Sequence, residues 1–285
     1  MTSRPAGARR SQLLLALTGA VAARAALAGV TTLAARPVGA PWRRTNYAGR
    51  PVTLLGGPAL ALSATATAVL GAPAGTRSAA ALVGAVAGLV GGYDDLAGAR
   101  PDQARDKGLA GHLRALREGR VSAGAVKVAG IGSAAAAAAV LTRGRAGGAR
   151  ALVDGILTTG LVAGSANLLN LLDLRPGRAA KAGALGAAAA LGGPAGGLVA
   201  GPLGATLAVL PADLAEQVML GDCGANALGA LLGLRLAAMP RRGARAGALA
   251  VITGLTLASE KISFTRVIEA TPGLRELDRL GRLPS

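Results

Sequence analysis

Carboxylate side chains at the ends of apolar runs are the residues of this sequence with the clearest capacity for chemistry. Asp94 and Asp95 end one apolar run, and Asp222 lies just before another, in the pattern Gly-Asp-Cys-Gly. Adjacent carboxylates repel each other, and a hard divalent cation with oxygen ligands relieves that repulsion. Mg²⁺ in particular binds through one or two carboxylates plus substrate phosphates. The three aspartates therefore indicate phosphoryl transfer assisted by Mg²⁺.

A third polar group ends a further apolar run. Asn167, Asn170 and Asp173 follow each other at intervals of three residues, which puts them on one face of a helix. Asp94 and Asp95 alone would favour a solvated helix end with no chemical role. Three separate clusters at one inferred boundary favour a site, because acids at a membrane boundary are costly unless something positive joins them.

The loop after the aspartate pair is rich in glycine and in basic residues. Its glycines let backbone N–H groups approach phosphate oxygens, and Lys107 supplies a cation. His112 is the single histidine, and a substrate contact and a loop hydrogen bond to neighbouring backbone explain it equally well. Arg114, Arg117 and Arg120 recur every three residues, which favours a basic stripe resting on anionic lipid.

An earlier loop contains two further polar candidates. In the stretch Asn46 to Val52, Arg50 is able to hold a phosphate. The alternative is an interfacial turn anchored by the aromatic residues Trp42 and Tyr47.

Composition places these residues in a membrane protein. The chain has 285 residues, of which 52% are hydrophobic and 16% charged, whereas soluble folds have about a quarter of their residues charged. The positive mean hydropathy of +0.47 excludes intrinsic disorder. The net charge of +17 comes with four aromatic residues, so stacking platforms for nucleic acid are nearly absent and anionic lipid head groups are the expected partner. The single cysteine, Cys223, excludes an internal disulfide framework.

The expected fold is an all-α, polytopic membrane bundle of about nine to ten transmembrane helices, forming one transferase-like domain over residues 1–285. The sixth and seventh spans are separated by Gly193 and Pro194, so that they form either one broken helix or a tight hairpin. The nine expected spans are 12–34, 52–71, 78–93, 121–141, 151–172, 179–193, 195–210, 225–238 and 246–258.

Basic residues in the loops predict the orientation. Regions near 36–51, 94–120, 173–181 and 211–222, with the tail 260–285, fall on one side and hold 18 of the 31 basic residues, against 10 on the other side. The excess of Lys and Arg predicts that this side is cytoplasmic. We therefore expect a multi-pass protein of the cell membrane with its site facing the cytoplasm.

The N-terminal residues allow a second interpretation. Basic residues followed by the apolar run Leu13 to Ala22 and the small residues Ala25 to Ala28 resemble a signal peptide. The favoured interpretation is an uncleaved first helix, because polytopic proteins commonly use that helix as their signal.

Taken together and in this order, these stretches resemble the polyprenyl-phosphate N-acetylhexosamine-1-phosphate transferase family. Any one of the motifs is weak, but the ordered set is fairly specific. The resembling stretches are Asn46 to Pro58, Gly92 to Asp95, Lys107 to Lys127, Asn167 to Asp173 and Gly221 to Gly224.

The resemblance implies a ten-helix enzyme of cell-envelope glycan synthesis that moves a sugar 1-phosphate from a UDP-sugar to a polyprenyl phosphate, with Mg²⁺. Asp94 would contact or deprotonate the lipid phosphate, Asp95 would organise the site, and Asn170 and Asp173 would contact the nucleotide. A homodimer is a further possibility. The expected catalytic residues are Asp94 and Asp95, and the expected Mg²⁺ ligands are Asp95 and Asp222. The expected substrate-binding residues are Asn46, Arg50, Lys107, His112, Asn167, Asn170, Asp173 and Arg266.

The sequence also departs from the family pattern. Leu174 and Pro176 stand where the family has a glycine and a second aspartate, and the late histidine-rich motif is absent. The segment Glu260 to Glu269 stands near that place, and Arg266 is its candidate for gripping a phosphate or carboxylate.

Two alternatives to a transferase remain open. The first is a catalytically silent relative that keeps the fold and binds a lipid phosphate, which the missing motifs favour. The second is a transporter whose pathway is lined by charges inside the spans. Two observations argue against a transporter: the sequence has no inverted repeat, and its acids cluster at one membrane boundary. The charges inside the spans are Arg24, Lys127, Asp154 and Arg235.

Overall fold

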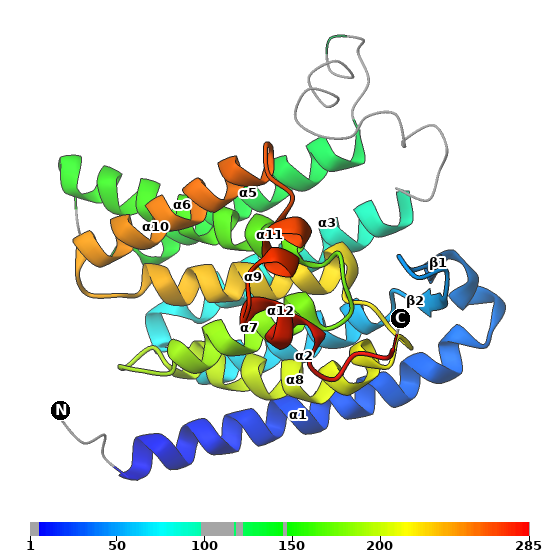
Figure 1. Cartoon of the computed structure of the whole chain (residues 1–285). Coiled ribbons are helices and arrows are strands. Elements are labelled where there is room, and N and C mark those ends of the chain that lie inside the picture. Colours follow the sequence, from blue (N-terminus) through cyan, green and yellow to red (C-terminus); the bar gives the residue numbers. More distant parts are fainter. Residues whose placement is uncertain (1–5, 98–116, 118–121, 145–146, 285) are drawn as a thin grey trace.

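The structure is a computed structural model that describes residues 6–97, 117, 122–144 and 147–284. These residues form a bundle of long helices, with a small two-stranded hairpin and short helices near the C-terminus (Figure 1). The expected all-α class is confirmed. The predicted loop near 94–120 lies largely outside the described residues.

Two strands and a set of helices make up the described chain. β1 (Arg43–Thr45) and β2 (Pro51–Thr53) pair antiparallel. The helices are α1 (Ala6–Ala34), η1 (Pro37–Trp42), α2 (Gly56–Gly71), η2 (Ala74–Thr76), α3 (Arg77–Ala97), α5 (Ala123–Thr142), α6 (Gly148–Leu172), α7 (Arg178–Ala189), α8 (Gly197–Leu214), α9 (Gly221–Ala237), α10 (Arg242–Ser259), α11 (Phe264–Ala270) and α12 (Leu274–Arg279).

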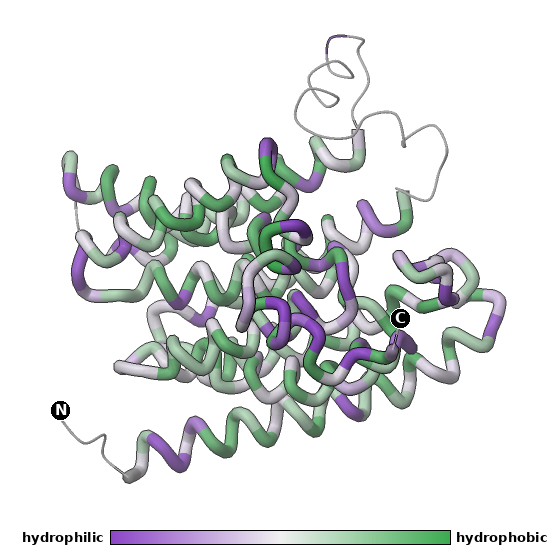
Figure 2. The backbone as a smooth tube through the Cα atoms, viewed as in Figure 1, coloured by the Kyte–Doolittle hydropathy of each residue, from purple (hydrophilic) through white to green (hydrophobic). Residues whose placement is uncertain are grey.

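The long apolar helices indicate a membrane protein. A helix lies at each expected span, and Figure 2 shows hydrophobic residues along most of α5 and α6. Within the described residues, however, five helices are long and apolar enough to cross a membrane, or six if α10 and α11, bent by 100°, form one span. α7 has 12 residues and rises by ~18 Å, well short of a hydrocarbon core of ~30 Å. The count of nine to ten spans is therefore not confirmed.

The sixth and seventh expected spans form a hairpin and not one broken helix. α7 packs against α8 and the two are joined through Gly193, which has a left-handed φ of 76°. Glycine adopts this conformation without the steric cost that a side chain imposes. The short α7 therefore returns along α8 within the bundle.

α9 is the central helix. It is buried along almost its whole length and packs against α2, α3 and α6. A Cβ atom on Gly229 would overlap the Ser165 carbonyl oxygen, and one on Gly233 would overlap the Leu161 carbonyl oxygen. Glycines at a spacing of four let the backbones of α9 and α6 touch, which is how helices associate closely in lipid.

Four of the predicted loop regions lie at the same end of the bundle. Thr53 of β2 pairs with Val218, which follows α8. The Arg50 guanidinium donates to the Pro284 carbonyl (2.9 Å), and Arg178 binds Asp278. These contacts join the regions near 36–51, 173–181, 211–222 and 260–285. The side of the membrane that this end faces stays a prediction.

The contact between α9 and α6 gives a testable prediction. Gly233→Ala should lower the free energy of unfolding by about 1–3 kcal/mol, because the added methyl group forces two backbones apart. Gly132→Ala on α5 is the matched control, since nothing lies within 4 Å of a Cβ built at that position. Thermal unfolding in detergent measures both variants, and equal stability of the two would contradict this packing.

Candidate functional site

Polar side chains from four helices converge at the end of the bundle that carries the hairpin. Asp94 and Asp95 lie near the end of α3, Lys127 in the first turns of α5, Asn170 in the last turn of α6 and Asp222 in the first turn of α9. Residues far apart in the sequence meet here because these helices either end or begin at this level.

Lys127 joins the carboxylates of α3 and α9. Its ammonium donates to Asp94 Oδ2 (2.6 Å) and to Asp222 Oδ2. With its amide oriented to satisfy both neighbours, Asn170 donates to Asp222 Oδ1 (2.9 Å) and accepts from Lys127 Nζ (3.2 Å). All four side chains are partly buried, so charge pairing is less screened than at an open surface. We name Asp94, Lys127, Asn170 and Asp222 the lysine cluster.

Asp95 performs a different task from its neighbour. Its Oδ1 accepts the backbone N–H of Asp222 (2.9 Å), and its Oδ2 accepts that of Cys223 (3.0 Å). The first N–H groups of a helix lack partners inside the helix, and a carboxylate there is also favoured by the helix dipole. Asp95 thus caps α9 from α3 and sets the position of Asp222 relative to Lys127.

Asp173 lies directly after α6, beside further carboxylates. Burial raises the pKa of Asp173 well above its usual range, and repulsion from Asp213, Asp222 and Asp95 raises it further, whereas the Gly221 N–H lowers it. Burial and neighbouring negative charges both disfavour the ionised form. Asp173 therefore adds a group to this end of the bundle that resists ionisation.

Asn46 and Arg50 organise the hairpin and hold Glu216. Asn46 Oδ1 accepts the N–H groups of Ala48 (2.9 Å) and Arg50 (3.0 Å), which closes the turn between β1 and β2. Its amide donates to Glu216, and the Arg50 guanidinium lies 3.3 Å from Glu216 Oε1. Glu216 is buried and has a left-handed φ of 56°. These contacts of Asn46 and Arg50 thus connect the hairpin to the loop before α9.

Of the other expected substrate-binding residues, two are exposed on helices and two lie outside the described residues. Asn167 is exposed on α6 and Arg266 is exposed on α11. Lys107 and His112 lie outside the described residues, so their expected roles stay predictions.

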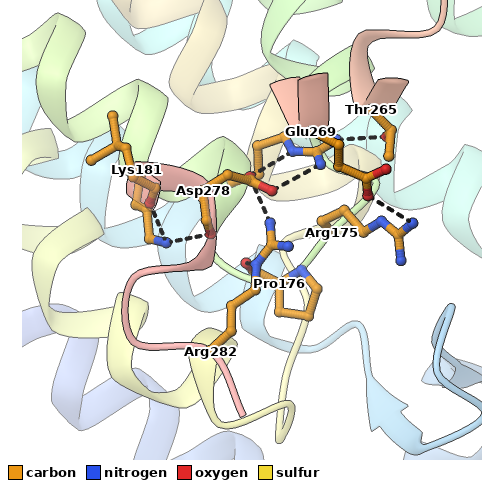
Figure 3. Close-up of polar contacts among 9 residues, drawn as sticks. Arg175, Pro176, Lys181, Thr265, Glu269, Asp278 and Arg282 are labelled. Atoms are coloured by element: carbon orange, nitrogen blue, oxygen red, sulfur yellow. Dashed lines mark hydrogen bonds and ion pairs between the residues drawn. The ribbon is translucent and has the colours of Figure 1, made fainter. Parts of the chain in front are cut away.

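The C-terminal segment is bound to the bundle through other residues than Arg266. The buried guanidinium of Arg178 donates to both carboxylate oxygens of Asp278 (2.8 and 3.1 Å) and to Thr265 (2.9 Å). Arg282 donates to Asp278 (2.6 Å), and Lys181 donates to the Asp278 carbonyl (2.8 Å). Figure 3 shows Asp278 between Lys181 and Arg282. α12 is thereby held against the start of α7.

The lysine cluster offers a donor set compatible with Mg²⁺. Among residues with described positions, no group of three His, Cys, Asp or Glu side chains has metal-site geometry. Asp94 and Asp222 nevertheless bind a single ammonium nitrogen together, which shows that both carboxylates reach one cation. Mg²⁺ commonly takes one or two carboxylates and completes its shell with water and phosphate. The residues therefore fit the expected ion.

Lys127 and Glu216 are site residues that the sequence prediction did not include. A lysine within an otherwise apolar helix is costly in a membrane unless a polar group binds it. The position of Lys127 in such a helix therefore already indicated a polar partner. Glu216 carried no such signal, because its left-handed backbone and its contacts with the hairpin arise only from the folded loop.

No protein-family model matches the chain, and a comparison with curated proteins finds no match. The resemblance to the transferase family therefore stays a prediction carried by the motifs themselves.

The cap on α9 predicts different outcomes for the two adjacent aspartates. Asp95→Asn should lower the free energy of unfolding by about 1.5–3 kcal/mol, because an amide NH₂ would face a backbone donor and lose a charged hydrogen bond. Asp94→Asn is the matched control, since the oxygen that binds Lys127 is retained. Thermal unfolding in detergent compares them; a larger loss in Asp94→Asn would show that the cap is not the stabilising contact.

The Asp278 ion pair predicts how the C-terminal segment responds to pH. Burial raises the pKa of Asp278, but its bonds to Arg178 and the nearby Arg282 outweigh burial, so this pKa lies below its usual range. A lowered pKa stabilises docking at neutral pH, and the contribution is lost only as pH falls through the lowered value. The rate of tryptic cleavage in residues 274–284, divided by the rate on a free peptide at the same pH, should therefore stay constant from neutral pH down to about pH 5.

Asp278→Asn should release the segment already at neutral pH, because losing one partner of a buried ion pair costs about 3–5 kcal/mol. The control is Glu260→Gln, an exposed acid between α10 and α11. Equal cleavage of both variants and the parent chain would contradict this account of docking.

Proposed function

We propose that this protein is a Mg²⁺-dependent phosphoglycosyl transferase, which moves a sugar 1-phosphate from a UDP-sugar to a polyprenyl phosphate at the cytoplasmic face of a cell membrane. The observation that carries the proposal is the lysine cluster. Three polar motifs of the sequence supply its carboxylates and its amide, and a fourth segment supplies a cation. Such a set suits reactants that carry phosphate groups.

The proposed reaction exchanges one phosphorus–oxygen bond for another. A non-bridging oxygen of the polyprenyl phosphate attacks the phosphorus bonded to the sugar. The bond from that phosphorus to the oxygen bridging it to the nucleotide breaks, and UMP leaves with the electron pair. The products are a polyprenyl diphosphate sugar and UMP.

Each residue of the lysine cluster has a separate role in the proposed reaction. Asp94 contacts the acceptor phosphate and takes its proton when that phosphate arrives protonated. Lys127 is positioned to turn its ammonium from the carboxylates to phosphate oxygens, and Asn170 keeps Asp222 oriented. Asp222 and Asp94, which share the Lys127 ammonium, would hold Mg²⁺, which neutralises diphosphate charge when bound. The expected ligand role of Asp95 is not proposed, because both of its oxygens accept N–H groups of α9.

An apolar groove beside the cluster supports a polyprenyl acceptor. The groove has a volume of about 740 Å³ and lies between α2 and α3. Leu62 and Leu89 line it, and it extends to Tyr93 and Cys223, which directly adjoin Asp94 and Asp222 in the chain. A hydrocarbon chain in this groove would bring its terminal phosphate to the cluster.

A catalytically silent protein that binds lipid phosphate is the second candidate. It is favoured by Lys127, which already neutralises two of the expected reactive carboxylates. Purified protein incubated with Mg²⁺, undecaprenyl phosphate and a panel of UDP-sugars separates the two candidates. Release of UMP that requires the lipid supports the transferase, and lipid binding without UMP release supports the silent protein.

The transferase proposal gives a prediction for Asp222. Asp222→Asn should raise the Mg²⁺ concentration for half-maximal UMP release by about tenfold, because the amide keeps the shape of the side chain but loses its charge. Glu260→Gln, an exposed acid beyond α10, is the control and should titrate like the parent chain. An unchanged Mg²⁺ titration in Asp222→Asn would remove Asp222 from the ligand set.

A further inference from the structure

A second polar site lies at the opposite end of the bundle from the lysine cluster. α5 and α9 begin near the cluster and end here, whereas α6 and α10 begin here. Asp154 on α6 accepts from Arg242 (2.6 and 2.8 Å) and from Arg245 (2.9 Å), both on α10. Asp154 is thus shared by two arginines, so that positive charge is in excess among these described side chains.

A pocket opens beside this ion pair. It has a volume of about 180 Å³, far above the ~15 Å³ that one water requires, and is lined by Arg143, Arg245, Thr142 and Thr158 among others. Arg245 is buried and uses its terminal nitrogens on Asp154 and Thr158, but its Nε has no hydrogen-bond partner among the described residues. An unsatisfied buried donor on a cation is expensive, and an anionic oxygen would satisfy it.

The pocket continues into an apolar groove along α5 and α6. The groove has a volume of about 880 Å³ and shares Ala139, Arg143 and Ala151 with the pocket. Its floor is formed by small residues, including Gly155 and Gly160. Arg143 is exposed at the junction of the polar pocket and the apolar groove.

We propose that this pocket and groove bind an anionic membrane phospholipid. The phosphate lies at Arg143 and Arg245, and one acyl chain follows the groove between α5 and α6. The excess of arginine over carboxylate selects an anion, and the apolar walls select a chain attached to it. Because α5 and α6 are both long and apolar enough to span a membrane, the site opens toward the leaflet opposite the lysine cluster. This site is independent of the proposed transferase reaction.

Two substitutions test the two halves of the site without disturbing the core. Arg143→Ala removes an exposed cation at the junction. Gly155→Leu fills the groove, since nothing in the protein lies within 4 Å of a Cβ built there. The matched controls are Arg9→Ala, an exposed arginine near the start of α1, and Gly132→Leu, an equally open glycine on α5 outside the groove.

The measurement is native mass spectrometry of the purified full chain in detergent, with phosphatidylglycerol, phosphatidylcholine, undecaprenyl phosphate or inorganic phosphate added separately. The parent chain should retain phosphatidylglycerol, and Arg143→Ala and Gly155→Leu should each weaken its retention by about tenfold, the effect of one charged hydrogen bond or of a displaced chain. Both controls should retain it like the parent.

Several results would overturn the proposal. Equal retention by Gly155→Leu and the parent would mean that no chain occupies the groove. Loss of undecaprenyl phosphate or of inorganic phosphate in Arg143→Ala, with phosphatidylglycerol retained as in the parent, would assign the pocket to those anions. Retention of phosphatidylcholine equal to phosphatidylglycerol would show that the arginines do not select charge.

Discussion

The capping of α9 by Asp95 is the interaction on which the arrangement of the site depends. α9 is buried along almost its whole length, so the first N–H groups of this helix cannot rely on water. Asp95 accepts two of them from a neighbouring helix. The same bonds fix the end of α3 against the start of α9, and this brings Asp94 and Asp222 to the one lysine of α5. The requirement that the first N–H groups of α9 find acceptors thus determines how residues of α3, α5 and α9 meet in the site.

The distribution of charge gives the two ends of the bundle opposite characters. At one end several carboxylates are balanced by Lys127 and by backbone N–H groups. At the other end Asp154 is shared by Arg242 and Arg245. Polar groups in an apolar bundle persist only where partners satisfy them. The carboxylates at one end therefore suit a cation, whereas the arginines at the other end suit an anion.

Much of the fold and part of the site followed from the sequence. Apolar runs predicted a helix at every expected span, but length and composition support fewer crossings, because α7 and α9 are short and packed among other helices. The end of an apolar run predicted that Asn170 and Asp173 lie at the end of a helix, and the structure has Asn170 in the last turn of α6 and Asp173 directly after it. The contacts of Asn46 and Arg50 could not be predicted in this way, because only the folded loop brings Glu216 to them. The exposed position of Arg266 depends on the bend after α10, which no local pattern predicts.

The adjacent aspartates illustrate why residue type alone left their roles unresolved. Successive residues of a helix point about 100° apart, so Asp94 and Asp95 cannot face the same partner. In the structure one faces the ammonium of Lys127 and the other faces the N–H groups of α9. Their mutual repulsion is thus offset by two different positive partners before any metal is considered. The need for Mg²⁺ in the proposed reaction then comes from the charge of the diphosphate substrate, and Asp95 serves that reaction by positioning the residues that would meet it.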